Sequence, residues 1–425
     1  MWNGSRVKNK QQGMKVRKDK KSGLQLSQPD NEENIAVVFG LFETALGVIR
    51  SLGRKGIKVI GIDFKKDIAW YSRYVKPMIC PHPLQHENKF IEWIHEVFKN
   101  IKCKLPVFFT SDDFLVSFSR NREIFNDYFL YNLVNQSLLE EIMNKYSQYL
   151  LVKKTGIDLP ATWLLENIKD IEKLPGDINF PVFIKGVEVN KWRKEIHGSI
   201  KGFLIKNSKE LYEKVNSIVI KNVPVILQEV IEGPDTNHFK YCSYTSQSGE
   251  ILAEFTLQKI RQNPVHFGVG AVVESVNKPE LIQTGRRLFS GIGFTGIGSA
   301  EFKYDNRDGR LKLIEINPRY WQQNYLATAC GINFPYINYL DLLQESPEYS
   351  GDFRQGIKWV NRYMDLDSFL KYRKEGNLKF RDWRKSLKGE KVYHDFTWDD
   401  PLPVLYDIGF GWKLIKTPLF IFKRL

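Results

Sequence analysis

Apolar runs and their interruptions near the start of the chain follow the order strand, helix, strand. The β-branched run Ile35–Phe39 is broken by Gly40, and Thr44–Leu52 then carries apolar residues at helical spacing. A second apolar run, Val59–Ile62, ends at Asp63. This order and spacing predict a βαβ unit within a parallel sheet.

A third strand is predicted at Pro106–Thr110, where an apolar run ends in a cluster of polar residues. Ligands of open α/β sheets bind at the carboxyl ends of such strands, which makes Asp112 a candidate site residue. The more ordinary role for Asp112 is to cap the helix that follows, and we expect that role.

Two glycine-rich stretches do not have the context of a dinucleotide-binding fingerprint. The first turn, Gly40–Gly47, lacks the G-x-G-x-x-G spacing. That spacing does occur at Gly291, Gly293 and Gly296, but it precedes a predicted strand instead of following one. We interpret these later glycines as tight turns.

The middle of the chain predicts an α+β region with two hairpins. Its predicted elements are a helix over Ser137–Leu151 with Lys145 inside it, strands over Pro181–Lys185 and Pro224–Ile231, a hairpin over Tyr241–Arg261 that turns at Ser248–Gly249, and a hairpin over Ser299–Arg319 that turns at Asn306–Gly309. Folding the second hairpin about its turn brings Glu301 roughly opposite Glu315.

Side chains alternate between the two faces of a strand, so Glu315 and Asn317 point to the same side. With Glu301 opposite them, two carboxylates and an amide converge, and the carboxylates repel each other unless a cation lies between them. An all-oxygen ligand set without His or Cys suits Mg²⁺ better than zinc. The alternative is that both glutamates are solvated strand residues paired with lysines. The joint pattern favours a metal site shared with phosphates, for which three cations are candidate partners: Lys145, Lys185 and Arg319.

Composition places the chain among ordinary globular proteins. Its 425 residues suffice for two or three domains, with 42% hydrophobic and 26% charged residues. The four cysteines are scattered without a C-x-x-C pair, which predicts neither a disulfide framework nor a zinc site and favours a reducing cytoplasm. They are Cys80, Cys103, Cys242 and Cys330. No run of 18 apolar residues predicts a membrane span.

The formal charge of +14 is uneven and leaves both ends of the chain open to interpretation. Residues 1–34 are basic, polar and without apolar periodicity, which predicts a disordered tail. A solvated tail is the ordinary interpretation, and contact with nucleic acid or anionic lipid is the alternative. At the other end, Ile408–Leu425 is apolar, aromatic and basic, so it is suited to a membrane surface or to packing against its own domain.

From about Lys145 to Pro335 the chain resembles the ATP-grasp superfamily, and within it the carboxylate–amine ligase branch that includes D-aspartate ligase and relatives in cell-wall and surface-polysaccharide pathways. The segment AEFKYDNRDGRLKLIEINPRYW, residues 300–321, is similar to the closing metal-binding hairpin of that superfamily. The preceding βαβ region resembles its pre-ATP-grasp domain. The resemblance implies an α/β and α+β chain with a pre-ATP-grasp domain over 35–135 and an ATP-grasp domain over 136–345, whose two subdomains divide near 225–235. The tail over 1–34 precedes them, and an extension over 346–425 lies beyond the shared core.

The same resemblance implies roles for individual residues. ATP and Mg²⁺ (or Mn²⁺) are the implied cofactors, with Glu301, Glu315 and Asn317 as metal ligands. Arg319 and Lys185 are the implied catalytic cations at the phosphates or acyl-phosphate. The implied ATP contacts are Lys145, Lys185, Gln228, the backbones of Glu229 and Ile231 at adenine, and Asp235 at the ribose. The implied contacts to a carboxylate substrate are Lys259 and Arg261.

The chain departs from the superfamily pattern around the second nucleotide lysine. Gly186 follows Lys185 where many relatives have proline. The loop that would cover the phosphates, residues 186–202, has few glycines and carries three cations: Lys191, Arg193 and Lys194. Such a lid either closes differently or recognises extra negative charge on the substrate.

The resulting hypothesis is an ATP-dependent ligase that joins a small-molecule carboxylate to an amine, with an acceptor that is either small or lipid- or sugar-linked. It works in the cytoplasm or at the inner face of the membrane, and nucleic acid is not an expected partner. No Ser–His–Asp or Cys–His set is apparent, and His238 and His266 are open to basic or structural roles. Two alternatives stay open: a biotin-carboxylase-like subunit, and an ATP-binding sensing module that contacts nucleic acid or membrane. Oligomeric state is not predicted.

Overall fold

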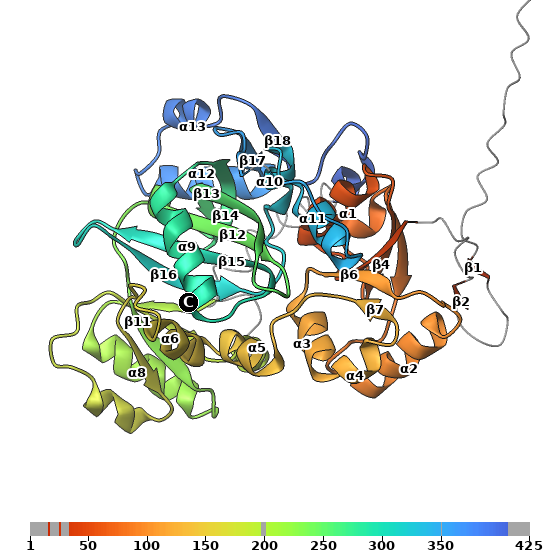
Figure 1. The fold of residues 1–425 in the computed structure, drawn as a ribbon. Helices are drawn as coiled ribbons and strands as arrows, with labels where there is room; N and C mark the ends of the chain where they lie inside the picture. Colours follow the sequence, from red (N-terminus) through yellow and green to blue (C-terminus); the bar gives the residue numbers. More distant parts are fainter. Residues whose placement is uncertain (1–15, 18–24, 27–33, 197–200, 350, 407–425) are drawn as a thin grey trace, which may run out of the picture.

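The computed structural model describes residues 16–17, 25–26, 34–196, 201–349 and 351–406 (Figure 1). The predicted tail over 1–34 lies almost entirely outside them, apart from paired two-residue strands β1 (Val16–Arg17) and β2 (Gln25–Leu26). The predicted apolar segment Ile408–Leu425 lies wholly outside them. Among the described residues, no helix is both long and apolar enough to cross a membrane.

The first domain is built on a five-stranded parallel sheet in the order β5-β4-β3-β6-β7, which confirms the predicted βαβ unit. The strands are β3 (Ile35–Phe39), β4 (Lys58–Asp63), β5 (Val75–Ile79), β6 (Leu105–Phe109) and β7 (Phe129–Leu130). The helices are α1 (Glu43–Gly53), η1 (Ile68–Tyr71), α2 (Glu87–Phe98), α3 (Asp112–Arg120) and α4 (Arg122–Phe125). The sequence pattern missed β5, because the edge strand VKPMI includes a lysine and a proline.

Alternation along β3 divides the residues of this sheet between two cores. Val37 and Phe39 belong to the core that contains α2 and α3, whereas Ala36 and Val38 belong to the core that contains α1. The second core also contains Leu326 and residues of two later helices, α10 (Asn324–Ala329) and α11 (Phe334–Leu342). The first domain therefore shares its core with the large sheet described below.

Two short helices, α5 (Gln136–Met143) and α6 (Lys145–Lys153), lead into the next unit. The prediction of one helix over Ser137–Leu151 was wrong. Asn144 interrupts it in an extended conformation and caps α6, with its side-chain oxygen accepting from the backbone N–H groups of Tyr146 and Ser147 at 3.1 and 3.0 Å. Lys145 is consequently the first residue of α6 instead of an internal one.

A small subdomain follows, built on a four-stranded antiparallel sheet in the order β10-β9-β11-β8 with its own apolar core. Its strands are β8 (Thr162–Leu165), β9 (Val182–Gly186), β10 (Phe203–Ile205) and β11 (Val225–Glu229). Its helices are η2 (Ile168–Lys173), α7 (Val189–Glu195) and α8 (Ser208–Val219). The predicted strands at 181–185 and 224–231 are confirmed as β9 and β11.

The large sheet has seven strands in the order β16-β15-β12-β13-β14-β17-β18. Its first five strands are β12 (His238–Thr245), β13 (Ile251–Asn263), β14 (Val269–Ser275), β15 (Gly296–Asp305) and β16 (Arg310–Asn317), accompanied by η3 (Asp235–Asn237) and α9 (Pro279–Gly291). Both predicted hairpins are confirmed, as β12–β13 and β15–β16.

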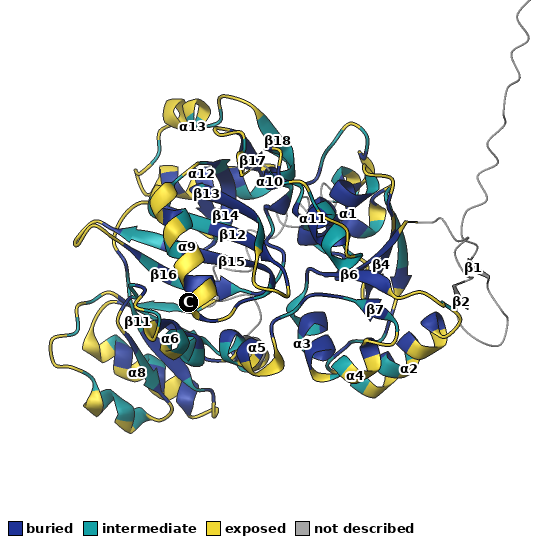
Figure 2. Cartoon of the chain, viewed as in Figure 1, coloured by how far each residue is buried: buried dark blue, intermediate teal, exposed yellow. Residues whose placement is uncertain are grey.

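The C-terminal extension completes this sheet. It contains β17 (Lys358–Val360), α12 (Arg362–Lys374), α13 (Phe380–Ser386) and β18 (Lys391–Tyr393). β17 pairs with β14, and β18 pairs with β17. The strands of the large sheet are mainly buried, whereas α13 is mainly exposed at the edge of the molecule (Figure 2).

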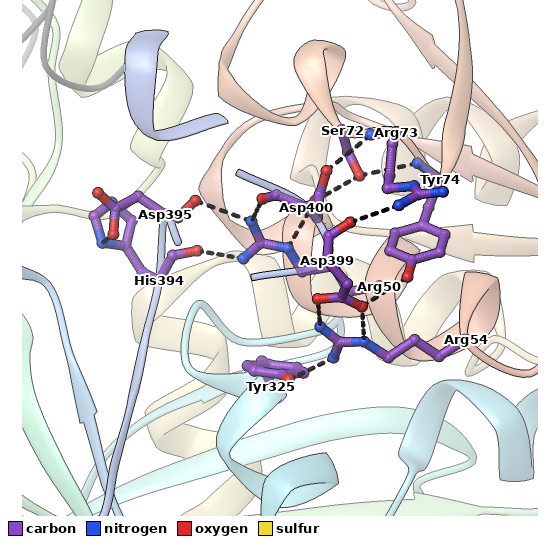
Figure 3. A network of polar contacts seen from close by, with 10 residues as sticks. All are labelled: Arg50, Arg54, Ser72, Arg73, Tyr74, Tyr325, His394, Asp395, Asp399 and Asp400. Atoms are coloured by element: carbon purple, nitrogen blue, oxygen red, sulfur yellow. Dashed lines mark hydrogen bonds and ion pairs between the residues drawn. The ribbon is translucent and has the colours of Figure 1, made fainter. Parts of the chain in front are cut away.

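A polar network ties the end of the extension back to the first domain (Figure 3). Arg50 of α1 is buried and donates through Nε to Asp400 at 2.8 Å, and Asp400 also accepts from the hydroxyl of Ser72 at 2.8 Å. Beside this pair, Arg54 donates twice to Asp399 at 2.7 Å. Residues 399 and 400 of the C-terminal extension are therefore bonded to Arg54 and Arg50 at the C-terminal end of α1, the first helix of the first domain.

Candidate active site

A cavity of about 510 Å³ lies between the small subdomain, the large sheet and the first domain. Its wall includes Phe42, Glu43, Thr44 and Asp112 from the first domain, Lys185 and Gln228–Ile231 from the small subdomain, and Glu301, Glu315 and Asn317 from the large sheet. Binding sites for small molecules and cofactors commonly have this size and lie between domains. The cavity is therefore the candidate active site.

The acidic wall of the cavity is formed by the β15–β16 hairpin. Glu301 pairs directly with Glu315 across the hairpin, as predicted, and the register shifts by one residue immediately after Glu301. Asn317 lies on the same face as Glu315 and donates through Nδ2 to its Oε1 at 3.0 Å. Glu301 is only 8% exposed, so it is not a solvated strand residue.

Cations surround both carboxylates. Glu301 is bonded to Lys259 and lies 3.5 Å from His238 Nδ1 and 3.8 Å from Lys240 Nζ. Burial by itself raises the pKa of Glu301, but Lys259 and its neighbours hold that pKa well below its usual range. Burial raises the pKa of Glu315, but Lys145, whose Nζ lies 3.5 Å away, acts together with Lys201 and the amide of Asn317 to place that pKa at about 2. Both carboxylates are therefore ionised at neutral pH.

The chemistry of this ligand set fits a hard divalent cation. Two ionised carboxylates and an amide oxygen are the donors that Mg²⁺ prefers, and Mn²⁺ accepts the same set. Within the described ranges there is no group of three or more His, Cys, Asp or Glu residues that could hold a metal. The amide of Asn317 stays the predicted third protein ligand beside the two carboxylates.

The predicted nucleotide lysines also line the cavity. Lys145 begins α6, and Lys185 lies on β9, where its Nζ donates to Gln228 Oε1 at 3.0 Å. Burial, together with the nearby charge of Lys145, lowers the pKa of Lys185 to about 8. Both lysines and Gln228 line the same cavity as the carboxylates, so the structure brings this predicted set together.

Arg319 connects the hairpin to the first domain. Its guanidinium lines the cavity and donates to both carboxylate oxygens of Asp112. Burial disfavours its charge, but Asp112 raises the pKa of Arg319 above its usual value. The predicted capping role of Asp112 was wrong, because Ser111 holds the capping position of α3 and the Asp112 carboxylate pairs with Arg319 instead.

The segment predicted to contact adenine and ribose is only partly in the cavity wall. Gln228, Glu229 and Ile231 line the cavity, and the Glu229 carboxylate pairs with Arg307 at 2.7 Å. Asp235 does not line the cavity. The Asp235 carboxylate accepts hydrogen bonds from Gln262 Nε2 at 2.7 Å and from the hydroxyl of Tyr372. Gln262, which Asp235 holds in place, lines the cavity instead.

The two predicted contacts to a carboxylate substrate separate in the structure. Lys259 lines the cavity, where it is bonded to Glu301 and donates to the Gly268 carbonyl at 3.3 Å. Arg261 does not line it and is instead buried against Asp365 of α12. Residues two apart usually share a face, but the pairing of β13 with β14 shifts register between Lys259 and Arg261.

Several cavity residues were not predicted from the sequence. They include Lys201, Lys240, Gln262 and Lys303. Lys303 follows Glu301 by two residues on one strand, so alternation alone could have identified it. Lys240 is the β12 partner of Glu301, and only the strand register reveals it. His238 and His266 both line the cavity, and burial lowers the pKa of His238.

The predicted phosphate-covering loop falls partly outside the described residues. Residues 197–200 and the side chain of Arg193 are not described. Of the rest of the loop, Trp192 of α7 and Lys201 line the cavity, whereas Lys191 and Lys194 are exposed and do not line it.

The sequence is similar to a family model and to two known enzymes. A family model described as an ATP-grasp in the biosynthetic pathway with Ter operon matches residues 260–362. The chain is 23% identical to a D-aspartate ligase of Enterococcus faecium (strain Aus0004) over 321 residues, which cover 72% of this chain and 75% of that protein. A biotin carboxylase of Bacillus subtilis (strain 168) is 20% identical over 182 residues, covering 40% of this chain and 38% of that protein.

Solved structures show the same fold. An L-amino acid ligase from Bacillus licheniformis superimposes with a TM-score of 0.58 at 18% identity, covering 77% of this chain and 78% of that one. An N5-carboxyaminoimidazole synthetase from Staphylococcus aureus, complexed with ADP, superimposes with a TM-score of 0.59 at 13% identity. The match covers 76% of this chain and 80% of that one. These comparisons confirm the predicted superfamily, the fold class and the enzyme class: a βαβ pre-ATP-grasp domain is followed by the two-subdomain fold of ATP-grasp ligases.

Proposed function

We propose that this ATP-grasp chain is an ATP- and magnesium-dependent carboxylate–amine ligase that forms an amide through an acyl-phosphate intermediate. One observation carries the proposal. The cross-strand pair Glu301 and Glu315, with Asn317 beside it, lines the same cavity as Lys145 and Lys185. Anionic metal ligands and phosphate-binding cations gathered in one cavity suit a metal–triphosphate complex.

The roles of the residues follow from their positions. Glu301, Glu315 and Asn317 would hold Mg²⁺, which when bound neutralises negative charge on the β- and γ-phosphates. Lys145 and Lys185, which line the same cavity, bind the phosphates of ATP. The end of β11, at Gln228–Ile231, binds adenine. Gln262 is better placed than Asp235 to meet the ribose, with Asp235 orienting it.

The reaction has two steps. A carboxylate oxygen of the first substrate attacks the γ-phosphorus, and the bond from that phosphorus to the oxygen of ADP breaks. The amine nitrogen of the second substrate then attacks the acyl carbon, the carbon–oxygen bond to phosphate breaks, and the amine loses a proton. Arg319, held by Asp112, stabilises the charge on the transferred phosphoryl group. Lys259 orients the substrate carboxylate.

The substrates we propose are a small-molecule carboxylate and an amine, at least one of them an amino acid. The similarity to proteins named D-aspartate ligase and L-amino acid ligase supports this class. The sequence resemblance to polysaccharide-associated relatives supports an acceptor that is lipid- or sugar-linked, and a place in cell-wall or surface-polysaccharide biosynthesis.

The test is magnesium-dependent ADP release over a panel of D- and L-amino acids, each offered with candidate amines and, separately, with hydroxylamine. Hydroxylamine traps an acyl-phosphate as a hydroxamate, so the first step is detectable even when the natural amine is missing from the panel. We expect ADP and hydroxamate to form together with one acid or a narrow class. A folded protein that binds ATP by calorimetry, yet forms neither product with any acid, would favour the ATP-binding sensing module.

A further inference from the structure

The C-terminal extension presents a strongly basic surface that the proposed reaction does not use. We define the basic cap as residues 366–388, which comprise most of α12, the linker after it and α13. It contains eight lysine and arginine residues against three acidic ones. All eight cations are exposed: Lys371, Arg373, Lys374, Lys379, Arg381, Arg384, Lys385 and Lys388. Figure 2 shows α13 mainly exposed at the edge of the molecule.

Large apolar side chains emerge between these cations. Leu366 and Leu370 are 44% and 54% exposed and lie four residues apart, which places them on one side of α12. Phe380 is 51% exposed, and its ring contacts Phe369 and Trp383, with centroids 6.1 and 5.6 Å away. The cap therefore combines positive charge with apolar side chains held outward by the fold.

The inward side of the cap is anchored to the wall of the cavity. Asp365, just before the cap, pairs with Arg261, and Tyr372 donates to Asp235. Of the acidic residues of the cap, Asp367 accepts from Asn263 at 2.6 Å and Glu375 pairs with His266 at 3.1 Å. Asp367 also pairs with Lys371 of the cap at 2.6 Å, so the charge of one of the eight cations is partly offset.

We propose that the basic cap docks on a membrane surface that contains anionic lipids. Its cations would face the lipid headgroups, and Leu366, Leu370 and Phe380 would enter the interfacial region. Nucleic acid would also satisfy the cations, and a base could stack on Phe380, but it offers nothing to the two leucines. The observations therefore favour lipid.

The same extension exposes a second group of apolar side chains, apart from the cap. Trp398 is 91% exposed, and Leu402 and Leu405 are also exposed. The neighbouring Asp399 and Asp400 bond to the C-terminal end of α1 in the first domain, and the docking proposal does not rest on this group. The docking proposal concerns the outer surface alone and does not require the ligase activity. If both hold, the cavity works beside a membrane.

The test is sedimentation of the full-length chain with vesicles of phosphatidylcholine alone or mixed with phosphatidylglycerol, at low and high salt. We expect binding to the mixed vesicles only, and weaker binding at high salt because screening reduces the attraction. The triple variant Arg381→Glu, Arg384→Glu, Lys385→Glu should weaken binding at least about tenfold, since each basic residue near an anionic surface contributes to binding. Phe380→Ala should weaken it as well.

The matched control is Lys169→Glu, Lys206→Glu, Lys209→Glu, which changes the net charge equally at exposed lysines of the small subdomain. We expect the control to bind vesicles within about twofold of the unaltered chain, because its changes lie away from the cap. Equal weakening by both triple variants would overturn the proposal, as would unchanged binding of the cap variant. Binding of the unaltered chain to single-stranded RNA through the cap, without binding to anionic vesicles, would also overturn it. ATP binding by calorimetry verifies that each variant is folded.

Discussion

At the scale of single residues, Glu315 shows how burial and charge oppose each other in this cavity. Burial disfavours its ionised form, yet the charges of Lys145 at 3.5 Å and of Lys201, together with the amide of Asn317, favour it more strongly. The carboxylate is thereby kept ionised, and the strand pairing places Glu315 opposite Glu301. A carboxamide of the same size would keep the shape of the site and remove one of its two negative charges.

We therefore expect Glu315→Gln to lower magnesium-dependent ADP formation by at least about a hundredfold, because charge at the metal is lost. The measurement is a coupled ADP assay over a range of magnesium concentrations. Glu280→Gln, at an exposed glutamate of α9, is the control and should retain full activity. Full turnover by a folded Glu315→Gln variant would contradict the metal assignment.

Lys185 predicts a pH dependence of ATP binding. Its pKa of about 8 lies below the ordinary value for lysine, so it is charged below pH 8 and neutral above it. ATP affinity should fall as the pH rises above 8, by up to about tenfold per unit, since the neutral amine no longer attracts phosphate. Titration calorimetry between pH 6.5 and 9.5 would measure this.

Lys185→Arg is the natural comparison, because a guanidinium stays charged throughout this range. Its ATP affinity should fall less with rising pH than that of the unaltered chain; any remaining dependence would come from Lys201, another cavity lysine whose pKa burial lowers. A flat profile for the unaltered chain would show that Lys185 does not bind the phosphates in its charged form.

At the scale of elements, an aromatic contact joins the two sides of the cavity. Phe183 of β9 stacks on Phe267, in the loop between β13 and β14, with ring centroids 4.7 Å apart and planes inclined by 21°. Both residues line the cavity. The loop itself is held by α12, since Tyr372 accepts from the backbone N–H of His266 at 3.3 Å. The C-terminal extension thus positions one partner of a contact between the small subdomain and the large sheet.

Phe267→Ala should weaken ATP binding by about threefold to tenfold, because a stacked pair contributes about 0.5–1.5 kcal/mol beyond its buried area. Phe267→Tyr keeps the ring and should bind nearly as well as the unaltered chain. Calorimetric affinities of the two variants would decide this. Equal affinities would mean that the stacking does not help to hold the nucleotide cavity together.

Alternation and turn chemistry explain which site elements could be predicted. The β15–β16 hairpin turns where its Asn-Arg-Asp-Gly sequence predicts, which brings Glu301 within one residue of Glu315. The direct pairing of the two glutamates also needs the register shift after Glu301, which the sequence did not indicate. Arg261 was predicted to contact the substrate but is buried against Asp365 outside the cavity. The register shift in β13 that turns it away is not visible in a single sequence. The break at Asn144 was missed because the apolar periodicity continues across it.

At the scale of the whole molecule, contacts between distant parts of the sequence were beyond prediction. Arg50 and Asp400 are separated by 350 positions and form a buried pair (Figure 3). Nothing in the local pattern of either segment indicates the other. The same holds for β17, which extends the large sheet from a region that the sequence resemblance did not cover.

The adjacent residues Asp399 and Asp400 allow a matched comparison of stability. Asp400→Asn leaves Arg50 buried without its counter-charge and should lower the free energy of unfolding by about 3 kcal/mol. Asp399→Asn alters the pair with Arg54, in which both side chains are partly exposed, and should cost at most about 1 kcal/mol. Chemical denaturation would measure both. Similar losses would show that the buried pair does not anchor the extension.

The most direct test of the proposed reaction follows the carboxylate oxygens of the substrate. An acid that supports ADP release is prepared with oxygen-18 in its carboxylate and turned over with its amine, and the released phosphate is analysed by mass spectrometry. Formation of an acyl-phosphate predicts that each phosphate carries one oxygen-18 and that the amide keeps the other. Unlabelled phosphate, formed together with ADP, would mean that ATP reacts with water or by another route, and would contradict the account.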